Sequence, residues 1–388
     1  MGGTDIVQQR NYWQYLPSIA RLRWLDVLKF FILLFFSLFD FYKWGFRIFD
    51  IAALPLVAIA SLTLIGQKWI KISLLISVAV AGVYAAVGLL SSEYYLTVLA
   101  IFVNFFLFFV LSLKEFKPSQ KQIEVVLLIH IFFFFFQLVS FYQMEKIINY
   151  HAFTDIDPRL ESSIFRPAGL FYEPAMYCYT TLILTTMLDS KKSKYGILEA
   201  LAMVSMVLSV SFLGFAFAAL IITKQILAKK FMAPILCVLT ISFVSGEQQI
   251  AILTFIENRV SDLGADASAQ GRYGELFNIV SSKHWIYSLF GRGFGASFEQ
   301  FGASGASAAI SAVGVLGVMV FTSWILFRSR ELMAGFIALV GIMISAPIFS
   351  YMIFPYWMAN IVRRRGVCAL HNADVQRRSI VGAPLNGR

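Results

Sequence analysis

Two segments of the chain place arginine among glycine, proline and aromatic residues. The first spans 166–174 (RPAGLFYEP), and the second begins at Gly271-Arg272 and continues to the glycine-rich stretch 289–295 (LFGRGFG). A guanidinium can donate two parallel, charge-assisted hydrogen bonds to phosphate oxygens. These residue types make Arg166 and Arg272 candidates for binding an anion such as a diphosphate.

The end of the first segment is also typical of a helix start. Pro174 suits the first helical turn because that position needs no N–H donor, and Glu173 before it lies favourably at the positive end of a helix. Spacing alone therefore leaves two interpretations open. Arg166 is either an interfacial arginine beside a capped helix or an anion ligand that points into a cavity.

The second segment offers further polar candidates, namely Arg259, His284 and Arg292. Tyr273, Leu276, Phe277 and Val280 recur at helical spacing, so the alternative is a short amphipathic helix on a membrane surface with solvated arginines. The stretch 291–295 lacks the preceding strand and the fixed spacing of a nucleotide-binding loop.

The histidines and cysteines do not predict a metal centre. None of His130, His151, His284 and His371 is paired at ligand spacing, and three widely separated cysteines form neither a disulfide framework nor a metal motif. We expect His130 to form a hydrogen bond between helices. His151 and His284 fall in polar loops, where a histidine can titrate near neutral pH.

The composition requires an apolar environment around these segments. The chain has 388 residues, of which 59% are hydrophobic and 14% charged, against about 45–50% and about 25% in soluble domains. We predict an all-α, polytopic membrane protein with about eleven or twelve transmembrane helices. The net charge of +10 comes from short basic clusters between apolar runs, which indicates membrane topology rather than nucleic-acid binding.

Apolar runs of suitable length define the expected helices. They cover 25–42, 48–66, 72–91, 94–113, 123–142, 171–188, 196–209, 211–223, 231–246, 306–327 and 332–362. The stretch 196–223 has lysines at both ends, so we favour a hairpin that turns at Ser209, Ser211 and Gly214, with one long tilted helix as the alternative. Similarly, Pro347 suggests a hairpin within 332–362.

This topology predicts one membrane domain, 1–362, with two larger periplasmic loops at 143–170 and 247–304. Most of the 32 lysines and arginines then lie on the cytoplasmic side, as the positive-inside rule requires. Residues 363–388 differ in composition, and we predict a basic, disordered cytoplasmic tail.

The two arginine segments, each tied to an outer loop, resemble those of Wzy-type polysaccharide polymerases, which share a superfamily with the O-antigen ligases. The resemblance covers roughly 120–330 and implies a GT-C-like glycosyltransferase in the bacterial inner membrane with a periplasmic active face. It departs at 209–211, where relatives often carry a Ser-Arg pair, and at 304–309, where many relatives carry a histidine.

The resemblance implies transfer of a growing glycan from undecaprenyl diphosphate to a lipid-linked repeat unit. In that reaction Arg166 and Arg272 would stabilise the diphosphate leaving group, and Glu173 would be a candidate base. Tyr172, Arg259, His284 and Arg292 would contact the substrates. No cofactor or metal is implied, and the expected partners are membrane lipids, a chain-length regulator and a flippase. The alternatives are an O-antigen ligase, disfavoured by the missing histidine, and a transporter or flippase.

Overall fold

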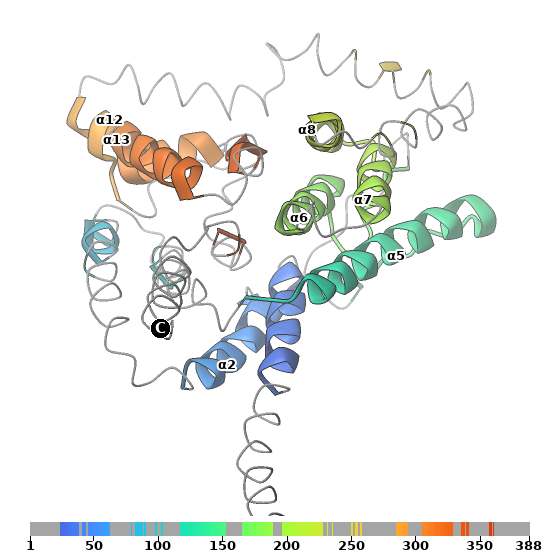
Figure 1. Cartoon of the computed structure of the whole chain (residues 1–388), viewed down its shortest axis with the longest axis horizontal. Coiled ribbons are helices and arrows are strands. Elements are labelled where there is room, and N and C mark those ends of the chain that lie inside the picture. The colour runs from blue at the N-terminus through green and yellow to red at the C-terminus, as the bar shows by residue number, and fades with distance from the viewer. Residues whose placement is uncertain are drawn as a thin grey trace, which may run out of the picture.

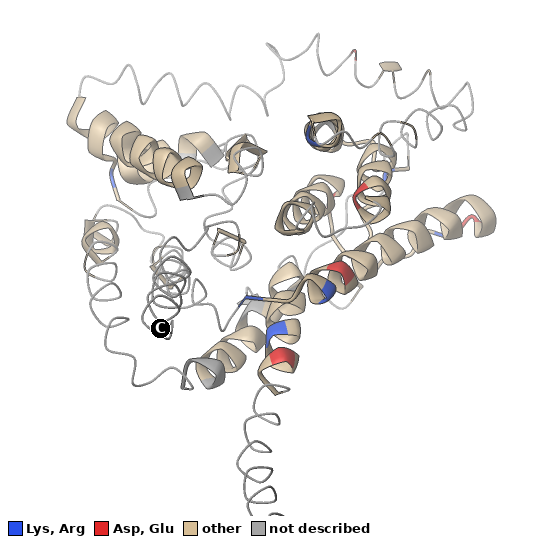
Figure 2. Ribbon diagram, viewed as in Figure 1, with Lys and Arg blue, Asp and Glu red and all other residues tan. Residues whose placement is uncertain are grey.

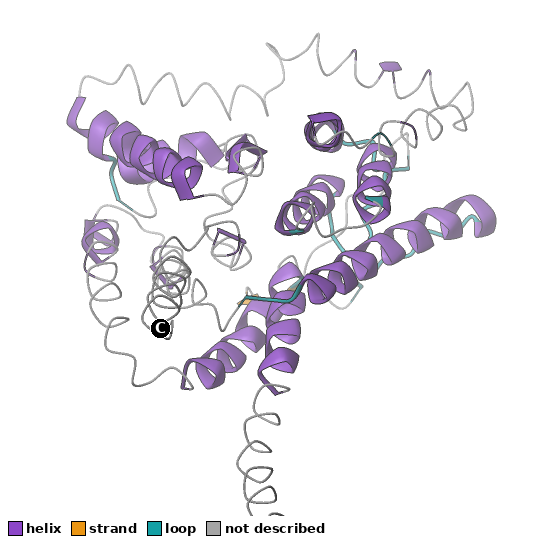
Figure 3. Cartoon of the chain, viewed as in Figure 1, coloured by secondary structure: helices purple, strands orange, loops and turns teal. Residues whose placement is uncertain are grey.

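The computed structural model describes residues 24–38, 41–43, 46–62, 117–152, 165–188, 196–227, 285–293 and 305–328, together with short pieces within 79–103, 231–257 and 335–360. These residues are mostly helical (Figure 3). Within them, strand structure is confined to β1 (Tyr42–Lys43) and β2 (Phe46–Arg47), an antiparallel pair that the sequence did not predict. The pair leads into α2 (Ile48–Leu62).

The longest helix among the described residues is α5 (Gln120–Met144), which runs beneath α6, α7 and α8 in Figure 1. It begins with a capping box, in which the Ser119 hydroxyl accepts from the amide of Gln122 and the Gln122 side chain accepts from the amide of Ser119. Such a box satisfies two amides that the first turn leaves without helical partners. The start of α5 is therefore fixed by its own sequence.

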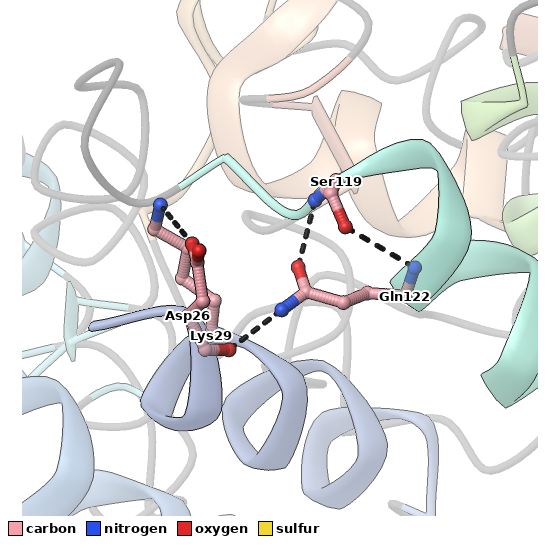
Figure 4. Close-up of polar contacts among 4 residues, drawn as sticks. All are labelled: Asp26, Lys29, Ser119 and Gln122. Carbon is pink, nitrogen blue, oxygen red and sulfur yellow. Dashed lines mark hydrogen bonds and ion pairs between the residues drawn. The ribbon is translucent and has the colours of Figure 1, made fainter. Parts of the chain in front are cut away.

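A helix over residues 24–37 packs against α5 in the same chain direction. The Gln122 amide nitrogen donates to the carbonyl of Asp26 at 2.6 Å, close to an ion pair between Asp26 and Lys29 (Figure 4). Further along both helices, His130 Nε2 lies 2.9 Å from the hydroxyl of Ser37. Two contacts in the same chain direction establish that the helices point the same way, and the second confirms the expected interhelical bond of His130.

α7 (Ile197–Leu208) and α8 (Phe212–Leu227) form an antiparallel hairpin, which confirms the favoured interpretation of the stretch 196–223. Lys224 near the end of α8 pairs with Glu199 at the start of α7 at 3.4 Å, and both side chains are buried. At the turn, Gly214 lies against Met206 and Ser209. A side chain there would separate the two helices, so glycine sets their distance.

α6 (Pro174–Met187) packs against α5, α7 and α8. It starts three residues later than the predicted run 171–188, because the chain turns at Gly169 and Leu170 and bends through 171–173 before the helix. Almost every α6 side chain is buried, including Tyr177, whose hydroxyl donates to Ser205 of α7 at 2.6 Å. α6 is therefore the centre of this helix group.

A second group contains α12 (Trp285–Phe290) and α13 (Gly305–Arg328). α13 is kinked at Gly314, which has φ 71° and ψ 174°. The amides of Arg292 and Gly293 donate to the carbonyls of Ser311 and Ala312 at 2.7 and 3.1 Å. The chain after α12 thus supplies donors where the kink interrupts the helical hydrogen-bond pattern.

Two helices of the described part are long and apolar enough to cross a membrane, judged by length and composition: Gln120–Met144 and Ala309–Phe327. Charged residues lie towards the ends of the helices, and the ribbon of α6 is tan throughout (Figure 2). Helices occupy the predicted runs 25–42, 48–66, 123–142, 171–188, 196–209, 211–223 and 306–327. The remaining runs and the tail 363–388 fall largely or wholly outside the described residues.

Replacing Gly214 with alanine tests the close hairpin. The new Cβ would meet the Met206 carbonyl and would lie 2.9 Å from both Cys178 Sγ and Ser209 Oγ, so we expect a loss of about 1–3 kcal/mol. Thermal unfolding of the detergent-solubilised protein should begin several degrees lower. Gly82→Ala is the matched control because nothing lies within 4 Å of its Cβ. Equal unfolding temperatures for the two variants would contradict the observed packing.

Candidate functional site

The first arginine segment runs back along α5 instead of ending at its tip. Phe165 stacks on Phe141 with ring centroids 3.9 Å apart, and Phe171 stacks on His130 at 5.4 Å. The contact positions on α5 therefore move from 141 to 130 as the segment advances, a distance of roughly 16 Å along the helix. The non-helical segment 165–173 thus reaches the middle of α5.

One buried side chain of α5 holds this segment. The Gln137 Oε1 atom accepts from the amides of Ala168 and Gly169 at 2.8 and 2.9 Å, and its Nε2 donates to the carbonyl of Ile148 at 2.9 Å. Gly169 has φ +57°, and a Cβ there would lie 3.3 Å from the backbone of Phe134. Only glycine suits both the left-handed backbone and this close approach.

Arg166 connects the segment to the tip of the α7–α8 hairpin. Its Nε donates to the carbonyl of Val210 at 3.0 Å, and its side chain is half-buried. Val210 has φ 48°, which is unusual for a β-branched residue and costs about 1–3 kcal/mol. The arginine thus satisfies a carbonyl in a strained turn, while the other two guanidinium nitrogens also carry N–H donors.

The second turn of α6 contacts Ser209, which directly precedes Val210 in this turn. Cys178 Sγ is 3.0 Å from Ser209 Oγ, and the Ser209 hydroxyl donates to the carbonyl of Met206 at 2.6 Å. Both residues are completely buried. A thiol without solvent access cannot attack a substrate, so we assign Cys178 to packing.

Glu173 and Tyr172 follow on the same segment. Glu173 is the N-cap of α6 and Pro174 occupies its first turn, as the sequence predicted. The carboxylate makes no capping hydrogen bond, and both Glu173 and Tyr172 are half-buried. Arg166, Tyr172 and Glu173 therefore lie on one eight-residue segment next to the hairpin tip, partly accessible from outside the core.

Arg292, the described member of the second arginine segment, belongs to the other helix group. Its guanidinium carbon lies 5.6 Å from the ring centroid of Tyr287, and the residue is exposed. Nearby α12 side chains are exposed as well, namely Trp285, Ile286, Tyr287 and Phe290. Arg259, Arg272 and His284 lie outside the described residues.

His151 differs from the expectation that it titrates near neutral pH. Its ring stacks on Phe41 at 4.5 Å, its Nε2 lies 3.0 Å from the carbonyl of Leu170, and only 2% of the residue is exposed. Burial lowers its pKa below the usual 6.5, and the bond to Leu170 opposes that shift. His151 therefore holds the first arginine segment at Leu170.

Among the described residues no three His, Cys, Asp or Glu side chains cluster to hold a metal ion. Gln137 was not predicted as a functional residue, although its amide directly after five consecutive phenylalanines (132–136) is a recognisable signal. A polar side chain in an apolar helix usually has a specific partner. The capping box at the start of α5 was not predicted either, although its Ser-x-x-Gln spacing is visible at 119–122.

Comparison with known proteins returned no match of the chain to a family model, a curated protein or a solved structure.

The neutral, buried state of His151 predicts a pH-dependent stability. Because its folded pKa lies below the unfolded value of 6.5, the unfolded chain binds more protons as the pH falls below 6.5. The contribution is therefore complete above that pH and is lost in more acidic solution. We expect the unfolding temperature of the wild type to fall more steeply between pH 6.5 and 5 than that of His151→Gln. Parallel curves would contradict this assignment.

Proposed function

We propose that the chain is a polytopic membrane protein that polymerises lipid-linked oligosaccharides on the outer face of the bacterial inner membrane. In this reaction a growing glycan leaves undecaprenyl diphosphate and is transferred to a hydroxyl of the next lipid-linked repeat unit. The observation that carries the proposal is Arg166, a half-buried guanidinium held at a helix-hairpin tip.

Exposed apolar surface on the long helices supports a membrane location. On α5 the exposed side chains follow one stripe along the helix: Val125, Leu128, Phe132, Phe136 and Val139. α13 likewise exposes Met319, Val320 and Phe327. Such continuous apolar faces are unfavourable in water and suit lipid contact. The helices 24–37 and 120–144 have the same chain direction. This fits a topology in which both cross the membrane from the cytoplasmic side to the outer side.

The short helices support a substrate site within the membrane thickness. α6 and α7 have 14 and 12 residues, roughly 21 and 18 Å, and neither spans a hydrocarbon core of about 30 Å. The Arg166 segment and the hairpin tip would then meet within the membrane, below its outer surface. A diphosphate carried on a lipid must be reached from that depth.

The chemistry asked of the site is stabilisation of a leaving group. As the bond from the sugar to the diphosphate breaks, negative charge grows on the phosphate oxygens. A guanidinium already fixed near them lowers the barrier without reorganisation in the transition state. Glu173 would accept the proton of the attacking hydroxyl, and Tyr172 would contact a sugar.

A transporter or flippase of lipid-linked glycans is the second candidate, because non-helical segments and half-helices at membrane depth are also typical of transporters. The segment 165–173 and the turn 209–211 are of that kind. The two functions predict different phenotypes. Loss of a polymerase leaves single repeat units on the outer surface, whereas loss of a flippase removes outer repeat units altogether.

The first test is the glycan ladder of cells that carry only a variant protein, at matched membrane levels. We expect Arg166→Ala to reduce the ladder to single repeats, and Arg166→Lys to leave at most a weak ladder because lysine lacks the planar pair of donors. Arg272→Ala should act similarly. A normal ladder in both alanine variants would remove these residues from the site, and a normal ladder after gene deletion would remove the polymerase proposal.

A second substitution separates the chemical role of Arg166 from its contact with the strained turn. Val210→Gly removes the penalty of the positive φ, which offsets the stability that is lost with the hydrogen bond from Arg166 to the carbonyl of residue 210. We expect Arg166→Ala combined with Val210→Gly to recover thermal stability but not the ladder. Recovery of both would mean that Arg166 serves the turn alone.

Glu173→Gln tests the proposed base. The amide keeps the size of the side chain and removes its ability to accept a proton, so we expect a ladder at least about tenfold weaker. Glu145→Gln is the matched control, because Glu145 is exposed at the end of α5 and outside the proposed site. Equal ladders from the two variants would exclude Glu173 as the base.

A further inference from the structure

We infer that Gln137 is a positioning residue for the Arg166 segment, a role that rests on the proposed function of that segment. Gln137 lies on α5, is 1% exposed, and does not belong to either arginine segment. Its side-chain amide forms hydrogen bonds that join α5 both to the residues that follow α5 and to the segment 165–173.

The geometry gives the amide three hydrogen-bond partners. Two consecutive amides, of Ala168 and Gly169, donate to one oxygen, and the amide nitrogen donates to Ile148. Both N–H groups belong to a non-helical stretch inside an apolar core, where a donor without a partner costs about 1–3 kcal/mol. Among the side chains that the structure describes, Gln137 alone is observed to accept from these two amides.

The consequence reaches Arg166 through a short path. Ala168 is two residues from Arg166, and the turn that it begins closes with the Phe171 amide donating to its carbonyl at 3.1 Å. Fixing Ala168 and Gly169 therefore fixes where the arginine leaves the core and meets Val210. Loss of the amide bonds would let this stretch move away from α5, with Arg166 on it.

The test compares Gln137→Met, which keeps the length of the side chain and removes all three bonds, with Gln137→Glu. A protonated carboxyl retains an accepting oxygen and an O–H donor, so it can replace the amide. Gln225→Leu is the control for losing a buried glutamine, since Gln225 is 2% exposed on α8 and has no observed bond to the segment 165–173.

Two readouts are needed on the purified full-length protein and on cells. Hydrogen–deuterium exchange of a peptide that covers 166–173 should be roughly tenfold faster in Gln137→Met, near the wild-type rate in Gln137→Glu, and unchanged in Gln225→Leu. The glycan ladder should shorten in Gln137→Met and return in Gln137→Glu, at equal membrane levels.

The outcomes separate this inference from the proposed function. Unchanged exchange in Gln137→Met overturns the role of Gln137. Faster exchange with a normal ladder, while Arg166→Ala loses its ladder, also overturns it and leaves the polymerase proposal standing. If exchange is faster in purified Gln137→Met but the glycan ladder survives deletion of the gene, then the amide holds the segment and the proposed function is wrong.

Discussion

A backbone that leaves helical structure inside an apolar core must find partners for its amides and carbonyls, and this constraint governs the region around Arg166. The segment 165–173 meets it through Gln137 on α5 and through His151, which lies 3.0 Å from the carbonyl of Leu170. The hairpin tip meets it through the bond from Arg166 to Val210. The polar side chains buried here are thus explained by the places where the chain stops being helical.

The same bonds determine how α6 is presented. Because the chain descends along α5 before the helix begins, α6 starts deep in the group and buries nearly all of its side chains. Its Tyr177 and Cys178 then meet Ser205 and Ser209 of α7. The small side chains of Cys178, Ser205 and Ser209 allow these helices to approach closely, and their polar contacts specify the pairing more than apolar packing alone would.

Local sequence predicted the helices well because apolar runs, Pro174 and the Ser-Gly pattern at 209–214 act over a few residues. It could not predict that 165–173 lies along α5, since the bonds that hold it there join residues 31 and 32 positions apart. Val210 adopts a positive φ without the glycine that normally signals one. Candidate residues were therefore found by chemical type, whereas their support by Gln137 became visible only in three dimensions.

In the proposed reaction, the hydrogen bond from Arg166 to the protein itself would have a role of its own. A long, flexible side chain loses about 2 kcal/mol of rotamer entropy when a ligand fixes it. The bond from its Nε to Val210 imposes much of that order in advance, and the planar guanidinium then directs its remaining nitrogens along a defined plane. A lysine has one charged nitrogen and no such plane, so it cannot hold the turn and orient a pair of donors together. If the proposed function is correct, arginine at position 166 would combine the structural need of the turn with the planar donor geometry that suits a diphosphate.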